Sequence, residues 1–449
     1  MSITLRGGTT GPNSNASSTS ISLPSGVAVG DVSFLCYVQA QNSPTSNTMA
    51  TFTPPSGWTV LHNNGCVVVC WRAFQTGDAT TGITCSSSRS DWWESACVTY
   101  TGLDTTSPVD ASNFSNQLSI SDTFTTYNNT IVAPSLNPNF NGSQLLAIMC
   151  ECGSSSGTLN TPSGMTSRAS STSGPMVRIS DLALTDGTPT GPKTATNTNN
   201  AHMHFGMQIA LKASGAAGAT LAAAMPIVCG RINDNTNGAS RTINLDWMNV
   251  QDGDLVVVWG VNGDSSHPTY VLTPPAGWTT HLGAGSGMLF SRKWSTGDSK
   301  TPAFTLTGAA YVNLCSIVIR KTGVSALAVN VDQVSANTYS GSTSLTGTAP
   351  SLTPAQTHEL LLVLHGVGTA NATTWSSITG GLTDEDIQTS SGPGSRFSWL
   401  QDAPSPSGTF SATGAASGSL TMTSAALLAM IGTPGGGGGA ARPVVMVCT

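Results

Sequence analysis

The chain has 449 residues and a formal net charge of −6, and only 8% of its residues are charged. Sixteen Lys and Arg against 22 Asp and Glu, with no basic run, exclude the electrostatic footprint of a protein that binds nucleic acid. Because 39% of the residues are hydrophobic, the chain can still bury packed cores. Its many Gly, Ser, Thr and Asn residues favour short strands joined by turns.

Targeting and membrane-spanning segments are not evident in the sequence. The N-terminal residues lack a charged segment followed by an apolar one, which predicts no signal peptide and synthesis in the cytoplasm. The longest apolar runs, such as residues 360–364, are far shorter than the roughly 18 residues of a spanning helix. We therefore expect no membrane insertion.

The first quarter of the chain contains a corner motif between two strand-like runs. Gly-Asp at residues 30–31 precedes an apolar run, and residues 53–58 then read Thr-Pro-Pro-Ser-Gly-Trp. The two prolines fix an extended entry, and Gly57 supplies a turn conformation that other residues disfavour. We expect a fold-defining turn with Trp58 in the core. A second apolar run leads to Thr-Gly-Asp at residues 76–78.

Residues 90–94, Ser-Asp-Trp-Trp-Glu, form the patch that most suggests a ligand. Adjacent Trp side chains flanked by acids can offer a platform on which a sugar ring stacks while a carboxylate accepts from its hydroxyls. Neighbouring residues of a strand face opposite ways, so one Trp is expected in the core. Asp91, Trp92 and Trp93 are therefore candidates either for ligand contact or for packing and a subunit interface.

The second quarter follows the same order with weaker motifs. The apolar run of residues 145–149 leads to Thr-Pro-Ser-Gly-Met at residues 161–165 and to Thr-Asp-Gly at residues 185–187. An apolar run that ends at Leu211 closes the unit. Short apolar runs bounded by turn residues, without a helical period, predict antiparallel strands.

The second half of the chain repeats the first. Gly-Asp returns at residues 253–254, and the corner at 273–278 and Thr-Gly-Asp at 296–298 each lie 220 positions after their first copies. Residues 349–352 repeat the Ala-Pro-Ser-Leu of residues 133–136. Matches in the same order predict a tandem duplication. The turn residues of the two corners are Pro54, Pro55, Gly57, Trp58, Pro274, Pro275, Gly277 and Trp278.

These patterns predict an all-β fold of tandem antiparallel β-sandwich modules, jelly-roll or immunoglobulin-like, of about 100 residues each. The expected modules are residues 1–114, 115–214, 215–334 and 335–433, in which the third repeats the first and the fourth repeats the second. Fully apolar runs such as residues 255–259 predict strands that are buried on both faces or covered by a neighbouring module.

The final stretch, residues 434–449, changes character. Five consecutive glycines, residues 435–439, form a flexible linker, and an apolar strand-like segment follows. We expect this segment to be an assembly arm that adds a strand to a neighbouring sheet, with a frayed terminus as the alternative. The arm residues are Pro443, Val444, Val445, Met446, Val447 and Cys448.

Sequence motifs of catalysis and metal binding are missing. There is no H-E-x-x-H, and the only acidic cluster, residues 384–386, fits a solvated turn. His202 and His204 would share one side of a strand but have no third ligand. We therefore expect no enzyme activity, no catalytic residues, no cofactor and no metal.

The ten cysteines include no C-x-x-C pair, which argues against a zinc or thioredoxin-like site. Cys66 and Cys70 would share one face of a strand and lie too far apart to bridge each other. Most of the others are expected to be small buried hydrophobes in apolar runs. These are Cys36, Cys97, Cys150 and Cys315.

The PPxGWT-type corner, the Gly-Asp before an apolar strand and the Thr-Gly-Asp turn resemble the β-sandwich repeats of bacteriophage virion structural proteins. Such repeats occur in tail, fibre and capsid-surface components. The resemblance implies a non-enzymatic structural component on the outside of a phage particle, made in the host cytoplasm and located in the virion. Its implied partners are other virion proteins and further copies of itself. The matching residues are 30–31, 54–58, 76–78, 253–254, 274–278 and 296–298.

The residues leave one alternative function open. In a carbohydrate-binding, adhesin-like protein, Trp92 and Trp93 would contact a glycan on a host surface.

Overall fold

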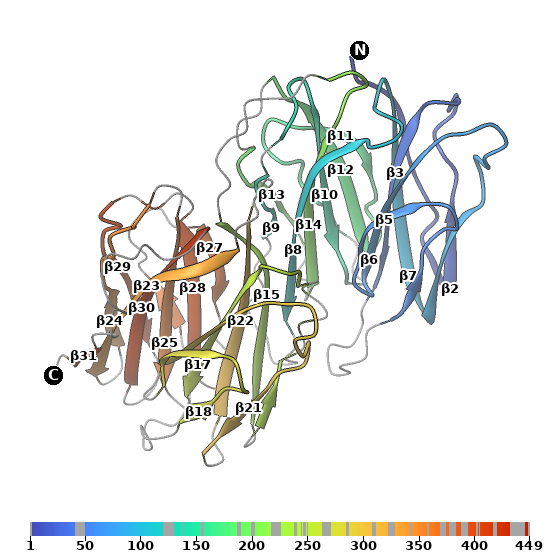
Figure 1. The fold of residues 1–449 in the computed structure, drawn as a ribbon. Helices are drawn as coiled ribbons and strands as arrows, with labels where there is room; N and C mark the ends of the chain where they lie inside the picture. The colour runs from blue at the N-terminus through green and yellow to red at the C-terminus, as the bar shows by residue number, and fades with distance from the viewer. Residues whose placement is uncertain are drawn as a thin grey trace. The chain divides into compact units, whose positions relative to one another are not determined.

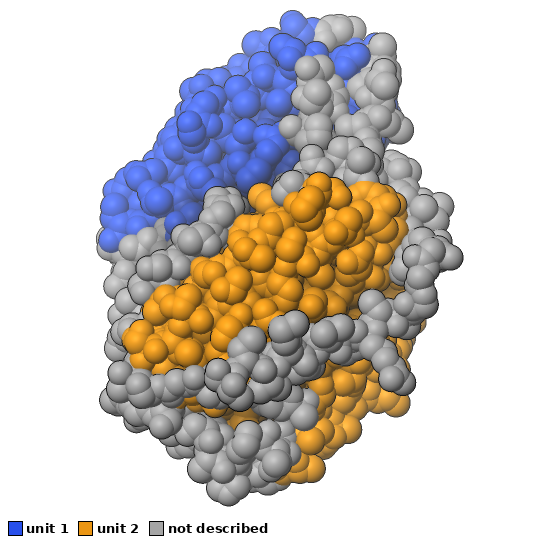
Figure 2. Space-filling view, turned by 90° about the vertical axis from the view of Figure 1, so that its left-hand side faces the viewer, with its two compact units in different colours: residues 1–118, 129–222 blue, residues 119–128, 223–449 orange. Residues whose placement is uncertain are grey.

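A computed structural model describes most of the chain, and the strands cover the greater part of it. Its described residues contain β-strands and turns and no α-helix. They divide into two compact units, residues 1–118 with 129–222 and residues 119–128 with 223–449 (Figure 2). The residues described are 2–40, 50–119, 130–136, 138–153, 157–185, 190–198, 203–216, 226–237, 240–243, 245, 248, 250–262, 271–283, 287–307, 311–321, 328–341, 344–356, 359–368, 374–376, 383–387, 394–400, 403, 405–415, 420–431 and 445–447.

The first large sheet of unit 1 has the strand order β1-β7-β3-β6-β5, and all its pairs are antiparallel (Figure 1). The long strand β7 also pairs with two shorter strands, β2 and β4. The strands are β1 (Thr4–Thr10), β2 (Ser14–Ile21), β3 (Val32–Gln39), β4 (Phe52–Thr53), β5 (Thr59–Asn63), β6 (Val67–Ala73) and β7 (Ile83–Thr101).

The second large sheet of unit 1 has the order β11-β12-β10-β14-β8, again antiparallel, and a two-stranded sheet of β9 and β13 accompanies it. The strands are β8 (Val109–Ser119), β9 (Thr130–Ala133), β10 (Gln144–Glu151), β11 (Thr166–Ser170), β12 (Met176–Ala183), β13 (Lys193–Thr196) and β14 (Met203–Leu211).

Unit 2 begins with strands in the order β15-β22-β17-β20-β19 and a small sheet β16-β21-β18. The strands are β15 (Pro226–Asn237), β16 (Ser240–Thr242), β17 (Leu255–Asn262), β18 (Leu272–Thr273), β19 (Thr279–Leu282), β20 (Gly287–Lys293), β21 (Ala303–Leu306) and β22 (Tyr311–Lys321).

The rest of unit 2 forms the sheet β27-β28-β25-β30-β23-β31 and the small sheet β24-β29-β26. The β23–β31 pair is parallel. The strands are β23 (Val329–Gly341), β24 (Ser344–Ala349), β25 (Leu360–Gly368), β26 (Thr374–Ser376), β27 (Thr383–Ile387), β28 (Gly394–Leu400), β29 (Phe410–Ala415), β30 (Leu420–Ile431) and β31 (Val445–Val447).

The central strands of unit 1 are buried on both faces because each face belongs to a different core. On one face of β10, Ala147 and Met149 pack with Ile131 of β9. The opposite face carries Cys150, whose sulfur lies 3.5 Å from that of Cys36 on β3. The two large sheets of unit 1 therefore pack face to face, with the smaller strands on their outer sides.

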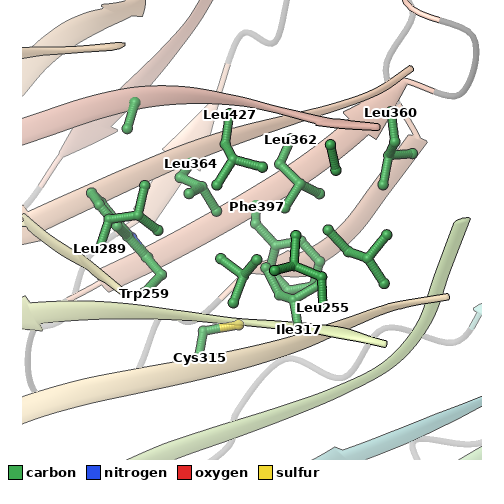
Figure 3. Close-up of a cluster of buried hydrophobic side chains, with 14 of the residues drawn as sticks. Leu255, Trp259, Leu289, Cys315, Ile317, Leu360, Leu362, Leu364, Phe397 and Leu427 are labelled. Atoms are coloured by element: carbon green, nitrogen blue, oxygen red, sulfur yellow. The ribbon is translucent and has the colours of Figure 1, made fainter. Parts of the chain in front are cut away.

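Unit 2 has the same arrangement of cores. Trp259 of β17 and Leu362 of β25 belong to one cluster, in which the side chains of the two large sheets point toward each other (Figure 3). The next residue of β25, Val363, packs on the outer side with Phe410 of β29. Alternation along a strand explains why every residue of β17 and β25 is apolar or closely packed.

The all-β fold of antiparallel sandwiches that the sequence predicts is confirmed. The burial of the apolar runs on both faces is confirmed as well. The internal duplication, the four module boundaries and the C-terminal arm remain predictions.

Candidate functional site

The first copy of the corner is held by one arginine. Gly57 has a φ of 79°, in the left-handed region that favours glycine. Nη1 of Arg72 donates to the carbonyl of Gly57 at 2.8 Å, and its Nε donates to Oδ2 of Asp78 at 2.9 Å. The same Oδ2 accepts from the backbone N–H of Gln75 at 2.9 Å. Arg72 on β6 thus ties the corner to the Thr-Gly-Asp turn, and its hydrogen bond lowers the pKa of Asp78.

The second copy of the corner repeats these contacts. Gly277 has a φ of 86°, and its carbonyl accepts from Nη1 of Arg292. Nε of Arg292 donates to Oδ2 of Asp298 at 3.1 Å, and the N–H of Ser295 donates to the same oxygen at 3.0 Å. In both copies the polar atoms of the motif pair with one another, so the motif is a structural corner and does not present these atoms to a ligand.

The Gly-Asp motifs are structural in the same way. Asp31 and Asp254 each accept from the backbone N–H three residues earlier. Each also binds an arginine, but from a different strand. Arg6 of β1 pairs with Asp31 at 3.0 Å, whereas Arg320 of β22 pairs with Asp254 at 2.7 Å. Sequence comparison misses these arginines because they do not occupy matching positions in the two halves.

The tryptophans of the corners are less buried than the sequence predicts. Trp58 is half-buried and packs against the edge of the first core, and Trp278 is half-buried with its ring 5.2 Å from that of Phe304. Each Trp directly precedes the last strand of its sheet, β5 or β19, which pairs with one neighbour only. The sequence therefore overestimates the burial of Trp58 and Trp278, because a position next to an edge strand leaves one side of the ring uncovered.

The two tryptophans of the β7 patch face opposite ways. Trp93 is fully buried, its Nε1 donates to the carbonyl of Ala16 at 2.8 Å, and its ring lies 5.1 Å from that of Phe52. Trp92 is 39% exposed, among the most exposed large apolar side chains of the described residues. Only Trp92 of the two can therefore contact a ligand from solution.

The Asp91 carboxylate is already engaged within the patch. It is almost fully buried, Oδ1 accepts from the N–H of Trp92 at 2.9 Å, and Oδ2 lies 3.6 Å from Nη2 of Arg89. A bulge in β7 carries Arg89, and Nε2 of Gln39 donates to the Arg89 carbonyl at 3.1 Å. The patch thus presents the partly exposed Trp92 side chain, while the Asp91 carboxylate is held by the Trp92 backbone and lies close to Arg89.

Glu94, the acid at the end of the patch, and Glu151 of β10 are both buried, and the sequence does not single out Glu151. Burial raises the pKa of Glu94 to about 7, with hydrogen bonds from Asn13 and from the Ser95 backbone acting in the opposite direction. Burial also raises the pKa of Glu151 to about 7, against a hydrogen bond from the N–H of Gly153 at 2.6 Å. These two carboxyls lie on different sheets, and neither forms a catalytic pair with the other.

The C-terminal strand β31 pairs in parallel with β23, with Val445 opposite Ala336 and Val447 opposite Thr338. It covers part of the outer edge of β23, whose other side pairs with β30. The remaining arm residues, Pro443, Val444 and Cys448, lie outside the described residues.

The histidine pair does not form a site in the described part of the chain. His204 is buried on β14, and His202 lies outside the described residues. Where the chain is described, no three His, Cys, Asp or Glu side chains are placed to hold a metal ion. Nor do these residues include a helix that is long and apolar enough to span a membrane.

Comparison with known proteins gives no family. No protein-family model and no curated protein matches the chain. Two of the solved structures found are VP2 of infectious bursal disease virus in a subviral particle, and a mutant VP2 of that virus in T=1 particles. The first is 12% identical over 97% of this chain and 82% of that chain, with a TM-score of 0.11. The second is 9% identical over 96% and 79%, with a TM-score of 0.12. TM-scores this low carry no argument about fold or function.

Proposed function

We propose that this chain is a non-enzymatic structural component of a bacteriophage particle, on its outside, as a tail or fibre component or a capsid decoration protein. The observation that carries the proposal is the use of its recurring polar residues. The aspartates of the repeated motifs pair with arginines of neighbouring strands in both halves of the chain. The surfaces and the strand edges of the sheets are therefore the parts of the chain that remain for contact with partners.

Assembly through strand edges follows from the end of the chain. An exposed edge offers unpaired N–H and C=O groups to any added strand. Part of the β23 edge is covered by β31, which follows five consecutive glycines in the sequence. The same edge can accept the corresponding strand of another copy, so the partners we propose are copies of this chain and other virion proteins.

Removal of residues 434–449 tests this assembly. We expect the full chain to form oligomers in light scattering, and the truncated chain to shift to monomer with an unchanged far-ultraviolet circular dichroism spectrum. Labelling of the C-terminus in intact particles should then place it at contacts between subunits on the particle surface. A truncated chain that keeps the oligomeric mass of the full chain would exclude assembly through the arm.

Contact with a host glycan is a second candidate function, favoured by the partly exposed side chain of Trp92. Sugar rings stack on such faces. If the candidate is right, Trp92→Ala should abolish binding on a glycan array. Val60→Ala, which removes another exposed apolar side chain, should leave it intact. Equal binding by both variants, or no binding by the natural chain, would remove this candidate.

A further inference from the structure

One cysteine pair faces across the two large sheets of unit 1. It joins β3 to β10, where the sulfurs of Cys36 and Cys150 are 3.5 Å apart and both side chains are fully buried. Strands of facing sheets that bring two thiols this close place them in the arrangement of an inter-sheet disulfide, as in immunoglobulin domains.

Cys66 and Cys152 lie at strand ends, Cys66 directly before β6 and Cys152 directly after β10. The sulfur of Cys66 lies 4.0 Å from that of Met203. The pair whose sulfurs the geometry brings within reach of a bridge is therefore Cys36 and Cys150.

We propose that Cys36–Cys150 is a disulfide site that cross-links the two large sheets of unit 1 when the chain meets an oxidised low-molecular-weight disulfide. Both thiols are free in this structure. The other buried thiols of the first sheet differ: Cys97, for example, donates to a backbone carbonyl, that of Val98, at 3.9 Å.

The alternative occupant of the two thiols is a soft metal ion. The described residues contain no group of three potential ligands in metal-binding geometry. The two facing sulfurs therefore fit a bridge better than a metal site.

The disulfide bridge between Cys36 and Cys150 forms by two exchange steps. The first cysteine thiolate attacks the small disulfide RSSR, a mixed disulfide forms, and RS⁻ leaves. The second cysteine sulfur then attacks the cysteine sulfur of the mixed disulfide and expels the second RS⁻. Two electrons pass from the cysteine pair to RSSR, and the two thiol protons end on two RSH. The sulfurs must approach from 3.5 Å to about 2.05 Å.

The Cys36–Cys150 bridge would close a loop between residues 114 positions apart. A loop of this length strongly restricts the unfolded chain, so oxidation should raise the melting temperature by on the order of 10 °C. The full-length protein is oxidised with oxidised glutathione, both folded and during refolding from denaturant. Free thiols are then alkylated in denaturant, and the bridged peptides are identified by mass spectrometry.

Two variants make the test specific. Cys36→Ala should lose the bridge and the rise in melting temperature. Cys97→Ala, at a fully buried position of the same sheet, should keep both. The proposal is overturned if Cys36 and Cys150 of the natural chain are both alkylated under both conditions, if its bridges join other cysteines, or if native mass spectrometry shows the two thiols holding a metal.

Discussion

At the scale of single residues, the charged groups of the repeated motifs tie turns to strands. Arg72 and Arg292 each close a corner onto a Thr-Gly-Asp turn. Arg6 and Arg320 each pair with the aspartate of a Gly-Asp motif. These four ion pairs hold corresponding turns in both halves of the chain.

The corner glycine can be tested against a matched glycine of the same turn system. Gly57 and Gly77 both have positive φ, 79° and 89°, but a Cβ at Gly57 would lie 2.0 Å from Nη1 of Arg72 and one at Gly77 would meet nothing within 4 Å. Gly77→Ala should cost about 1 kcal/mol of unfolding free energy through backbone strain alone. Gly57→Ala should cost about 2–3 kcal/mol, because it also displaces the Arg72 hydrogen bonds. Urea denaturation measures both.

A double variant separates the two causes. With Arg72→Ala as the background, Gly57→Ala should cost no more than Gly77→Ala, because the hydrogen bonds are already lost. If the excess cost of Gly57→Ala persists in that background, then Arg72 is not what holds the corner.

Glu151 makes stability depend on pH. Its pKa is raised from 4.5 to about 7 in the folded chain, so the folded state binds the proton more tightly than the unfolded state does. The stabilisation is complete below pH 4.5 and is lost as the pH rises to about 7. Glu151→Gln should remove about 1–3 kcal/mol of this decline in unfolding free energy.

The measurement is the difference between Glu151→Gln and the natural chain in urea denaturation from pH 4 upward. The difference is needed because the lowered pKa values of His281 and His365 act oppositely at acid pH. Glu94 and Glu359 add to the same decline as Glu151. If the natural chain and the variant keep a constant difference across this range, folding does not raise the pKa of Glu151.

At the scale of strands, the sequence predicts which segments become strands but not which sheets their faces pack against. Apolar runs show which segments become central strands, and alternation shows that one of Trp92 and Trp93 must be buried. The run of β17 does not reveal which side faces a small sheet and which faces the other large sheet, because both partners are apolar. The sequence does not predict the Cys36–Cys150 pair either, because its members are distant in sequence and belong to different sheets.

Glycines within the apolar strands mark where facing sheets approach most closely. A Cβ at Gly366 of β25 would lie 2.6 Å from Val261 and 3.1 Å from the Trp259 ring, both on β17. Gly366→Ala should therefore cost about 1–3 kcal/mol of unfolding free energy by overpacking. In a Val261→Ala background the same change should be nearly neutral. Equal costs in both backgrounds, measured by urea denaturation, would mean that the sheets separate freely here.

At the scale of the whole molecule, the packing units are pairs of sandwiches. Residues 1–118 with 129–222 form one compact unit, and residues 119–128 with 223–449 form the other. Sequence repeats favour four modules, because each repeat contains one set of strands and turns. The sequence repeats do not show that the large sheet of one predicted module is buried against that of the next. Because of this burial, we expect a pair of modules to be the unit of stability.

The pairing predicts how fragments of the chain behave. Residues 1–114 alone would expose the face of β3 that carries Phe34, Cys36 and Val38, all fully buried in unit 1. A face of this kind promotes aggregation. We expect fragment 1–114 to be insoluble or to bind a hydrophobic dye, and fragment 1–222 to be soluble and to melt cooperatively. A fragment 1–114 that is monomeric, melts cooperatively and binds no dye would show that each sandwich is stable by itself and that the face between sheets is only a docking surface.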